Sequence, residues 1–257
     1  MSGYKRVLAA TDESDQGAHA VEIACTIARN AGAVFEVVTV RTAGLVPATT
    51  SCRTSAPCLT AVTELHGLPG VEVVHHAESS RAELLVLGRS SRSRAAPAML
   101  GATSDGVIRR RLGPTLMVPR EVSRIERVLV ALDGSRRGLG VLGPGIDFAH
   151  VMGAELSVVC VLPEAPGALR DDEGWVDPRR ARVLETAAET GNGSGPIPTI
   201  MSTGEPIRHI LQTLDDLRCE VLVLGVRRGG PPGELGTGHV GRDVLRAAPG
   251  AVLTVPI

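Results

Sequence analysis

The chain has 257 residues, which is enough for one large domain or two small ones. Hydrophobic residues make up 43% of the chain and charged residues 21%, and the formal net charge is −1 at pH 7. This composition excludes a disordered chain, and the near-neutral charge with only 2% aromatic residues argues against a nucleic-acid partner. No apolar run reaches the roughly 18 residues of a membrane span, so we expect a cytoplasmic protein with no membrane partner.

Short aliphatic runs alternate with helical patterns along the chain. The first half has strand candidates at residues 7–10, 35–40, 71–74, 84–87 and 115–118, with helical patterns at 18–30 and 106–112. The second half has strand candidates at 128–132, 156–161, 197–200, 221–224 and 252–255, with helical patterns at 146–151, 206–214 and 240–248. Continuous aliphatic runs are typical of parallel strands that are covered on both faces. We therefore predict an α/β fold.

The two halves repeat each other. The run VLAATD at residues 7–12 returns 121 positions later as VLVALD, whereas LVLG at residues 85–88 returns 137 positions later. The second unit therefore has 16 more residues between its second and fourth strands. We predict two tandem, doubly wound, Rossmann-like units with mostly parallel five-stranded sheets, at residues 1–120 and 125–257.

The connection between the third and fourth strands is shorter in the first unit. The second unit places a helical pattern there, at residues 206–214, whereas the first unit offers only residues 76–81. Either residues 71–74 are not a standard third strand, or one face of the first sheet lacks a helix. We predict that the first unit is trimmed by one helix and is less stable alone.

The cysteines, lysine and histidines exclude several kinds of chemistry. The five cysteines are odd in number and form no C-x-x-C pair, so we interpret them as reduced thiols. The single lysine, Lys5, excludes the lysine-containing phosphate loop. No metal-ligand spacing and no nucleophile–base pattern is recognisable, so we predict neither a metal site nor catalytic residues. The cysteines are Cys25, Cys52, Cys58, Cys160 and Cys219.

An aspartate ends the first strand of each unit, Asp12 in the first and Asp133 in the second. Ligands of open α/β sheets bind at the carboxyl ends of the strands, so each aspartate suits a hydrogen-bond acceptor for a ligand. Each also suits a turn or a helix cap, shared with Ser14 or Ser135. Both interpretations stay open at this point.

A glycine-bearing loop follows the fourth strand of each unit and leads into a helix. It begins at Gly88 in the first unit and at Gly225 in the second. Free backbone amides at a helix start attract anions, although ordinary surface loops also use glycine. Arginines near the first loop, at positions 89, 92, 94 and 109–111, favour either polyanion binding or a solvated face.

This pattern resembles the universal stress protein family over nearly the whole chain: a strand ending in aspartate, then a fourth strand ending in G-x-x-G, nine residues, and G-[ST]. The resemblance implies that the last strands of the two units pair, so that the chain forms an internal pseudo-dimer. It also implies an adenine-nucleotide site that binds ATP, with or without Mg²⁺. The implied binding residues are Asp12, Val40, Gly88 and Gly101 in the first unit, and Asp133, Val161, Gly225, Arg227, Gly229, Gly238, His239 and Val240 in the second.

The loops depart from the family pattern in both units. Ser91 and Arg228 stand where the second glycine is expected, and Ala102 and His239 stand where the hydroxyl residue is expected. A side chain at the glycine position crowds the phosphates. We therefore expect weak ATP binding, or binding in the second unit only, by a stress-responsive sensor or regulator that is not an enzyme.

Two alternatives remain. The chain is a nucleotide-free scaffold with degenerate loops and an unknown protein partner, or an ATP-hydrolysing enzyme of related fold. A homodimer of the whole chain also stays open.

Overall fold

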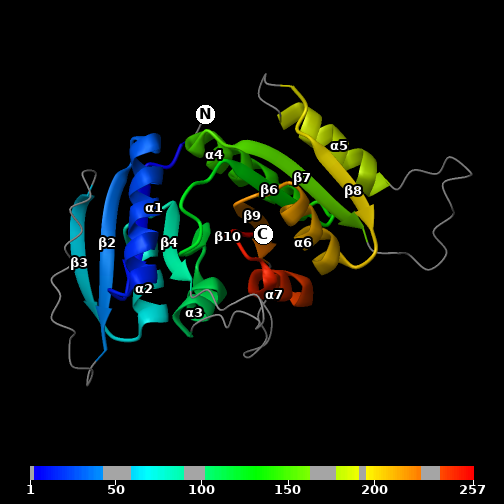
Figure 1. The fold of residues 1–257 in the computed structure, drawn as a ribbon. Helices are drawn as coiled ribbons and strands as arrows, with labels where there is room; N and C mark the ends of the chain where they lie inside the picture. The colour runs from blue at the N-terminus through cyan, green and yellow to red at the C-terminus, as the bar shows by residue number, and fades with distance from the viewer. Residues whose placement is uncertain (1–2, 43–58, 90–101, 163–177, 191–194, 227–237) are drawn as a thin grey trace, which may run out of the picture.

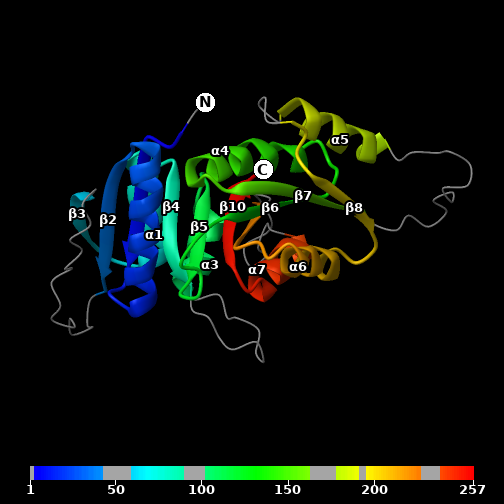
Figure 2. The same ribbon diagram turned by 45° about the horizontal axis from the view of Figure 1, so that its top comes forward.

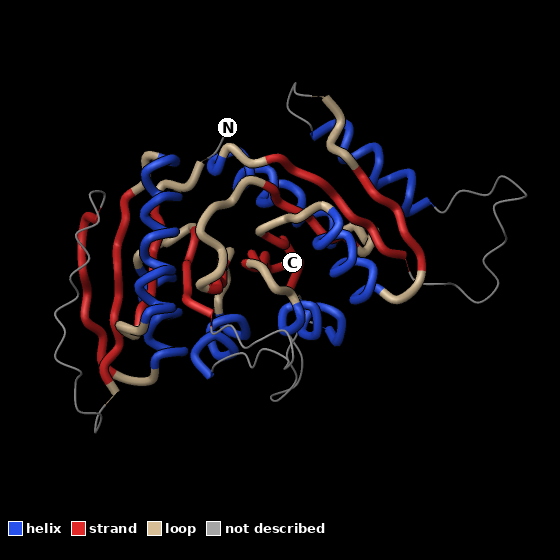
Figure 3. The backbone as a smooth tube through the Cα atoms, in the orientation of Figure 1, coloured by secondary structure: helices blue, strands red, loops and turns tan. Residues whose placement is uncertain are grey.

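The computed structural model describes residues 3–42, 59–89, 102–162, 178–190, 195–226 and 238–257 (Figure 1). Helices separate most consecutive strands (Figure 3), and among the described residues β3 directly follows β2 in the first unit. The first unit contains β1 (Arg6–Thr11), α1 (Asp15–Ala31), β2 (Val34–Arg41), β3 (Leu59–His66), α2 (Pro69–Ser79), β4 (Leu84–Arg89), α3 (Ala102–Arg110) and β5 (Thr115–Pro119). The second contains β6 (Arg127–Leu132), the 3-10 helix η1 (Gly138–Val141), α4 (Leu142–Met152), β7 (Glu155–Leu162), α5 (Pro178–Thr190), β8 (Thr199–Thr203), α6 (Pro206–Asp216), β9 (Val221–Val226), α7 (Gly238–Ala247) and β10 (Ala251–Pro256).

All ten strands form one sheet in the order β3-β2-β1-β4-β5-β10-β9-β6-β7-β8. Pairing within each unit is parallel, and the units join through the antiparallel pair β5 and β10, where Leu116 lies opposite Leu253. The predicted α/β fold and the predicted pairing of the last strands are therefore confirmed. Because β5 and β10 cover each other, neither is an open edge.

Helices cover both faces of the sheet, as Figure 2 shows. Buried residues of α1, α4 and α5 pack on one face, and those of α2, α3, α6 and α7 pack on the other. Alternate strand residues supply the two cores: Val7 and Ala9 face the first, and Leu8 faces the second. This two-sided burial explains why the strands are continuous aliphatic runs.

The prediction of a third strand at residues 71–74 is wrong. These residues lie in α2, and the third strand is β3, which pairs only with β2. Pro69 stands in the first turn of α2, where a missing N–H costs no hydrogen bond, and Pro206 does the same in α6. The first unit is therefore not trimmed of this helix. The second unit carries α5 between β7 and β8, whereas the first-unit segment between β2 and β3 includes residues 43–58, which lie outside the described residues.

The cysteines differ in part from the expectation of reduced thiols. Cys25, buried in α1, is disulfide-bonded, so the expectation is wrong for this residue. Cys160 and Cys219 are buried thiols that form no disulfide within the described residues, as expected. Cys52 and Cys58 lie outside the described residues. The odd number of cysteines did not exclude one disulfide among them.

Candidate functional site

A cavity of about 320 Å³ lies at the carboxyl ends of β1 and β4, beside the first turns of α1 and α3. It brings together three of the four binding residues expected in the first unit: Asp12, Val40 and Gly88. The fourth, Gly101, lies outside the described residues. The cavity is lined by Ala10, Thr11, Asp12, Ser14, Gln16, Gly17, Val40, Pro69, Val73, Leu87, Gly88, Arg89, Thr103 and Ser104.

Asp12 forms the turn that leads from β1 into α1. Its Oδ1 accepts hydrogen bonds from the backbone N–H of Ser14, at 3.1 Å, and from the Ser14 hydroxyl. Ser14 Oγ in turn accepts from the N–H of Gly17 at 3.1 Å and caps the helix. The turn interpretation of Asp12 is therefore confirmed, and the N-cap of α1 is Ser14. Within the described residues its second oxygen, Oδ2, makes no hydrogen bond, so a role toward a ligand stays compatible with the cap.

Gly88 allows the end of β4 to approach the first turn of α1. A Cβ at Gly88 would lie 2.6 Å from the carbonyl oxygen of Gln16 and 3.0 Å from the N of Gly17. A Cβ at Gly17 would in turn lie 2.4 Å from Thr11 Oγ1. These two glycines therefore allow the first turn of α1 to lie close to the ends of β1 and β4, where these elements form one wall of the cavity.

Two hydroxyl residues in the first turn of α3, Thr103 and Ser104, also line the cavity, and the sequence analysis did not assign them a role. The family pattern places its hydroxyl residue at position 102, which is alanine here. Helix α3 is held against α2 by a close contact, since a Cβ at Gly70 would lie 3.3 Å from Gly106 Cα. A pair of hydroxyl residues in the first turn of a helix was the signal that could have found them.

The second unit repeats the aspartate turn. Asp133 Oδ1 accepts from the N–H and the hydroxyl of Ser135, at 2.9 and 2.7 Å, and Ser135 Oγ accepts from the N–H of Gly138 at 2.9 Å. Val161 is buried in β7. A Cβ at Gly225 would lie 2.9 Å from the side-chain methyls Ile257 Cδ1 and Val141 Cγ2.

The remaining second-unit candidates are only partly described. Gly238 and His239 begin α7, and Val240 follows them with 39% of its surface exposed. The His239 side chain, Arg227 and Gly229 lie outside the described residues. The expectation that this loop holds phosphates in the second unit therefore stays a prediction.

Comparison with known proteins agrees with this architecture. The sequence pattern of the "Universal stress protein family" matches residues 3–53, 55–119 and 124–256. The chain belongs to the universal stress protein family. A universal stress protein from Archaeoglobus fulgidus DSM 4304 superposes with a TM-score of 0.78 at 19% identity, over 98% of each chain. A putative universal stress protein from Pseudomonas aeruginosa UCBPP-PA14 superposes with a TM-score of 0.74 at 15% identity, over 98% of this chain and 93% of that one. A search of curated protein sequences finds no significant match.

The arginines of this universal stress protein do not form the continuous basic face that the sequence suggested. Arg89 and Arg111 are buried, at 6% and 4% exposure, so the surface interpretation is wrong for both. Arg109 pairs with Asp105 on its own helix at 2.7 Å. Arg92 and Arg94 lie outside the described residues.

Metal ligands and membrane-spanning helices are two further features of interest in this universal stress protein. No group of three or more His, Cys, Asp or Glu side chains within the described ranges is arranged to hold a metal ion. Within the same ranges, every helix is too short or too polar to cross a lipid bilayer.

Proposed function

We propose that this universal stress protein binds an adenine nucleotide in the cavity of the first unit and acts as a sensor or regulator. The observation that carries the proposal is the cavity itself, which gathers Asp12, Val40 and Gly88 at the carboxyl ends of parallel strands. Its volume of about 320 Å³ falls within the range of small-molecule sites.

The lining of the cavity matches the parts of a nucleotide. Val40, Pro69 and Val73 offer apolar surface for a base. The free oxygen of Asp12 offers an acceptor for a ribose hydroxyl. Thr103 and Ser104 offer hydroxyl donors at the start of α3, where the helix dipole favours negative charge, so phosphates fit at this end.

Mg²⁺ would enter with the nucleotide. Asp12 is the single carboxylate among the described residues that line the cavity, and Mg²⁺ in nucleotide sites is held largely by phosphates and water. The protein's share of the metal site would therefore be one carboxylate at most. Removing Mg²⁺ should weaken ATP binding more than AMP binding, because AMP has fewer phosphate oxygens to bridge.

A binding role is favoured over catalysis by the chemistry of the lining. The described residues that line the cavity include no histidine, cysteine or lysine, so Asp12 is the one carboxylate among them that could act as a general acid or base. Its Oδ1 is already engaged in the cap of α1. This lining supports slow or absent hydrolysis and a binding role for the site.

The test is calorimetric titration of the intact protein with ATP, ADP and AMP, with and without Mg²⁺. Asp12→Ala and Asp133→Ala form a matched pair, because each aspartate makes the same turn in its own unit. Loss of binding in Asp12→Ala alone supports the first-unit site. Loss in Asp133→Ala alone moves the site to the second unit. Thr103→Val gives a further variant that leaves the cap of α1 intact.

A nucleotide-free scaffold is the second candidate, and one observation favours it. The space beside Gly225 in the second unit is filled by Ile257 and Val141, so this glycine accommodates protein side chains. Absence of binding at millimolar ATP, with no nucleotide in the native mass spectrum, would select the scaffold.

A further inference from the structure

A second cavity, of about 450 Å³, lies at the boundary between the two units. Residues that precede β1, β4 and β5 line it from the first unit, and Pro144 and Asp147 of α4 line it from the second. It therefore lies at the amino ends of the first-unit strands, whereas the cavity proposed for nucleotide lies at their carboxyl ends. None of its lining residues lines the first-unit cavity.

Acidic groups without a counter-charge line one part of this cavity. Asp147 makes no hydrogen bond or ion pair within the described residues, although it is half-buried. Glu83 accepts the N–H groups of Lys5 and Arg6 through Oε2, which leaves Oε1 without a partner among those residues. A half-buried carboxylate without a partner favours a ligand that brings N–H donors and positive charge.

Tyr4 adds a hydroxyl to this acidic part. Its hydroxyl oxygen is buried, and among the described residues it has no hydrogen-bond partner. Burial, together with the negative charges of Asp147 and Glu83, raises the pKa of Tyr4, so the hydroxyl stays protonated and can donate or accept. A buried polar atom without a partner is costly, and a bound polar group would relieve that cost.

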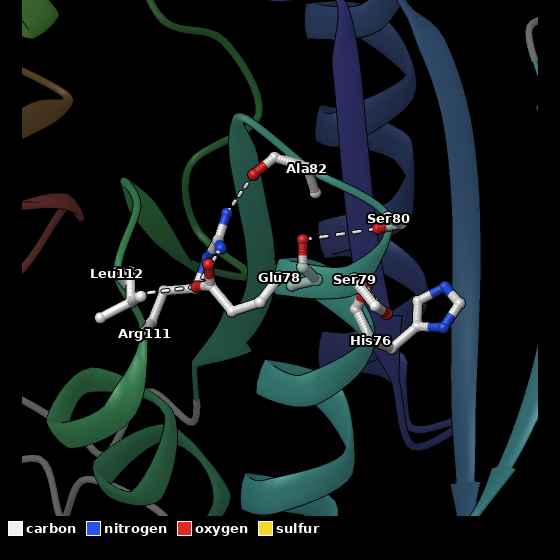
Figure 4. A network of polar contacts seen from close by, with 8 residues as sticks. His76, Glu78, Ser79, Ser80, Ala82, Arg111 and Leu112 are labelled. Atoms are coloured by element: carbon white, nitrogen blue, oxygen red, sulfur yellow. Dashed lines mark hydrogen bonds and ion pairs between the residues drawn. The ribbon is translucent and has the colours of Figure 1, made fainter.

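Basic groups line the rest of the cavity. Arg111 is buried and donates to Glu78 and to the carbonyl oxygen of Ala82, as Figure 4 shows, but its Nε–H has no partner. Arg81 has an exposed guanidinium that makes no ion pair in the described part of the chain. Among the described residues, four buried side-chain polar atoms have no partner, and two of these belong to residues of this cavity, Tyr4 and Arg111.

We propose that this inter-unit cavity binds an aliphatic α-amino acid. Its ammonium group pairs with Asp147 and Glu83 and hydrogen-bonds Tyr4, and its carboxylate pairs with Arg81. Leu112, Pro114 and Pro144 supply apolar surface for the side chain. A zwitterion satisfies both sets of unpaired charges, whereas a simple amine or a simple carboxylate leaves one set unpaired.

The experiment compares L-leucine with isopentylamine, which lacks the carboxylate, and isocaproate, which lacks the ammonium group. Each is titrated into the intact protein by calorimetry and by amide NMR. Each analogue should bind about tenfold or more weakly than leucine, because each loses charge-assisted hydrogen bonds. Equal binding of leucine and isopentylamine would overturn the zwitterion assignment, and no binding of leucine at about 10 mM would overturn the site.

Substitutions locate the site within the chain. Asp147→Asn and Arg81→Gln should each weaken leucine binding at least about tenfold. Arg218→Gln is the matched control: Arg218 is the counterpart of Arg81 in the second unit and shares its left-handed backbone, with φ of 51° against 55°. Leucine binding that survives Asp147→Asn, or that falls equally in Arg218→Gln, would contradict the assignment.

Tyr4→Phe separates a ligand contact from a structural role. The free protein should keep its melting temperature or gain slightly, because the lost hydroxyl has no partner. Leucine should nevertheless bind more weakly and stabilise the variant less. If Tyr4→Phe binds leucine as the parent does, the hydroxyl is not part of the site. ATP titration of the same variants should be unchanged, so failure here is distinguishable from failure of the proposed nucleotide site.

Discussion

The guanidinium of Arg89, at the end of β4, donates a hydrogen bond to the carbonyl oxygen of Ala248, just beyond the end of α7 in the other unit. It also donates to the carbonyl oxygen of Gly250 at 3.4 Å. Burial lowers the pKa of Arg89, and the charge of Glu121 opposes this shift. The carboxyl end of a helix carries partial negative charge, so a guanidinium suits this place. Arg89, which lines the first-unit cavity, thus stabilises α7, the helix that follows the second-unit loop.

Replacing Arg89 with methionine should destabilise the protein by about 1–3 kcal/mol, because the carbonyl groups of Ala248 and Gly250 lose a buried donor. Urea unfolding at neutral pH measures the effect. Arg137→Met is the control, since Arg137 is exposed and its side chain makes no hydrogen bond within the described residues. An unchanged unfolding midpoint in Arg89→Met would show that the link between the units contributes nothing to stability.

Alanine at Gly88 should be more damaging than alanine at Gly225, although the two glycines are counterparts. A Cβ at Gly88 meets backbone atoms of Gln16, whereas a Cβ at Gly225 meets the ends of the Ile257 and Val141 side chains. Backbone cannot move aside as side-chain methyls can, so we expect a loss of about 1–3 kcal/mol for Gly88→Ala and less than about 1 kcal/mol for Gly225→Ala. Thermal and urea unfolding of both variants compare them directly.

Nucleotide binding is a second measurement that compares Gly88→Ala with Gly225→Ala. Gly88→Ala should also weaken ATP binding at the proposed first-unit site, because α1 must shift away from β4. Gly225→Ala should leave that binding unchanged. If Gly225→Ala lost more stability or more ATP binding than Gly88→Ala, the close approach of α1 and β4 would be contradicted.

Glu220 should make stability depend on acid pH. Burial acts to raise its pKa, but hydrogen bonds from the N–H groups of Glu126 and Arg127 and from the Arg127 side chain outweigh burial, so its pKa is lowered. A carboxyl group with a lowered folded-state pKa contributes stability above its unfolded-state pKa and loses that contribution as the pH falls through the folded-state value. Glu220→Gln should therefore be less stable than the parent near neutral pH.

The measurement is urea unfolding of the parent and Glu220→Gln between about pH 7 and pH 3, and the difference between them should shrink toward the acid end. Glu185→Gln, at an exposed position on α5, serves as the control and should track the parent throughout. A constant difference across this range would mean that the charge of Glu220 does not stabilise the fold.

Most of the sheet could be predicted from the sequence, because strands buried on both faces are continuous aliphatic runs. The third strand of the first unit could not. Strand β3 lies at the edge of the sheet and mixes polar with apolar residues, and its Val62 is 49% exposed. The apolar run at residues 71–74 belongs instead to a helix, and short apolar runs do not distinguish helix from strand. Pro69, which lies 137 positions before Pro206, was the signal for that helix.

The candidate site could be predicted in part. Asp12, Val40 and Gly88 were expected together and do line one cavity. Thr103 and Ser104 were missed because the expected hydroxyl position is one residue earlier. The burial of Arg89 could not be predicted from the sequence, because its partner Ala248 lies 159 positions away. The two residues meet only through the antiparallel pairing of the two units.

That joining can be tested through Leu116 and Leu253, which lie opposite each other on β5 and β10 and are fully buried. Each Leu→Ala substitution should cost about 2–5 kcal/mol. The double variant should deviate from additivity by about 0.5–3 kcal/mol, because the two leucines are cross-strand neighbours in one buried cluster at the boundary. Leu8→Ala with Leu129→Ala is the control pair: both are fully buried, but β1 and β6 are separated by β4, β5, β10 and β9, so their effects should add. Strict additivity at Leu116 and Leu253 would mean that the two units unfold without energetic coupling across β5 and β10.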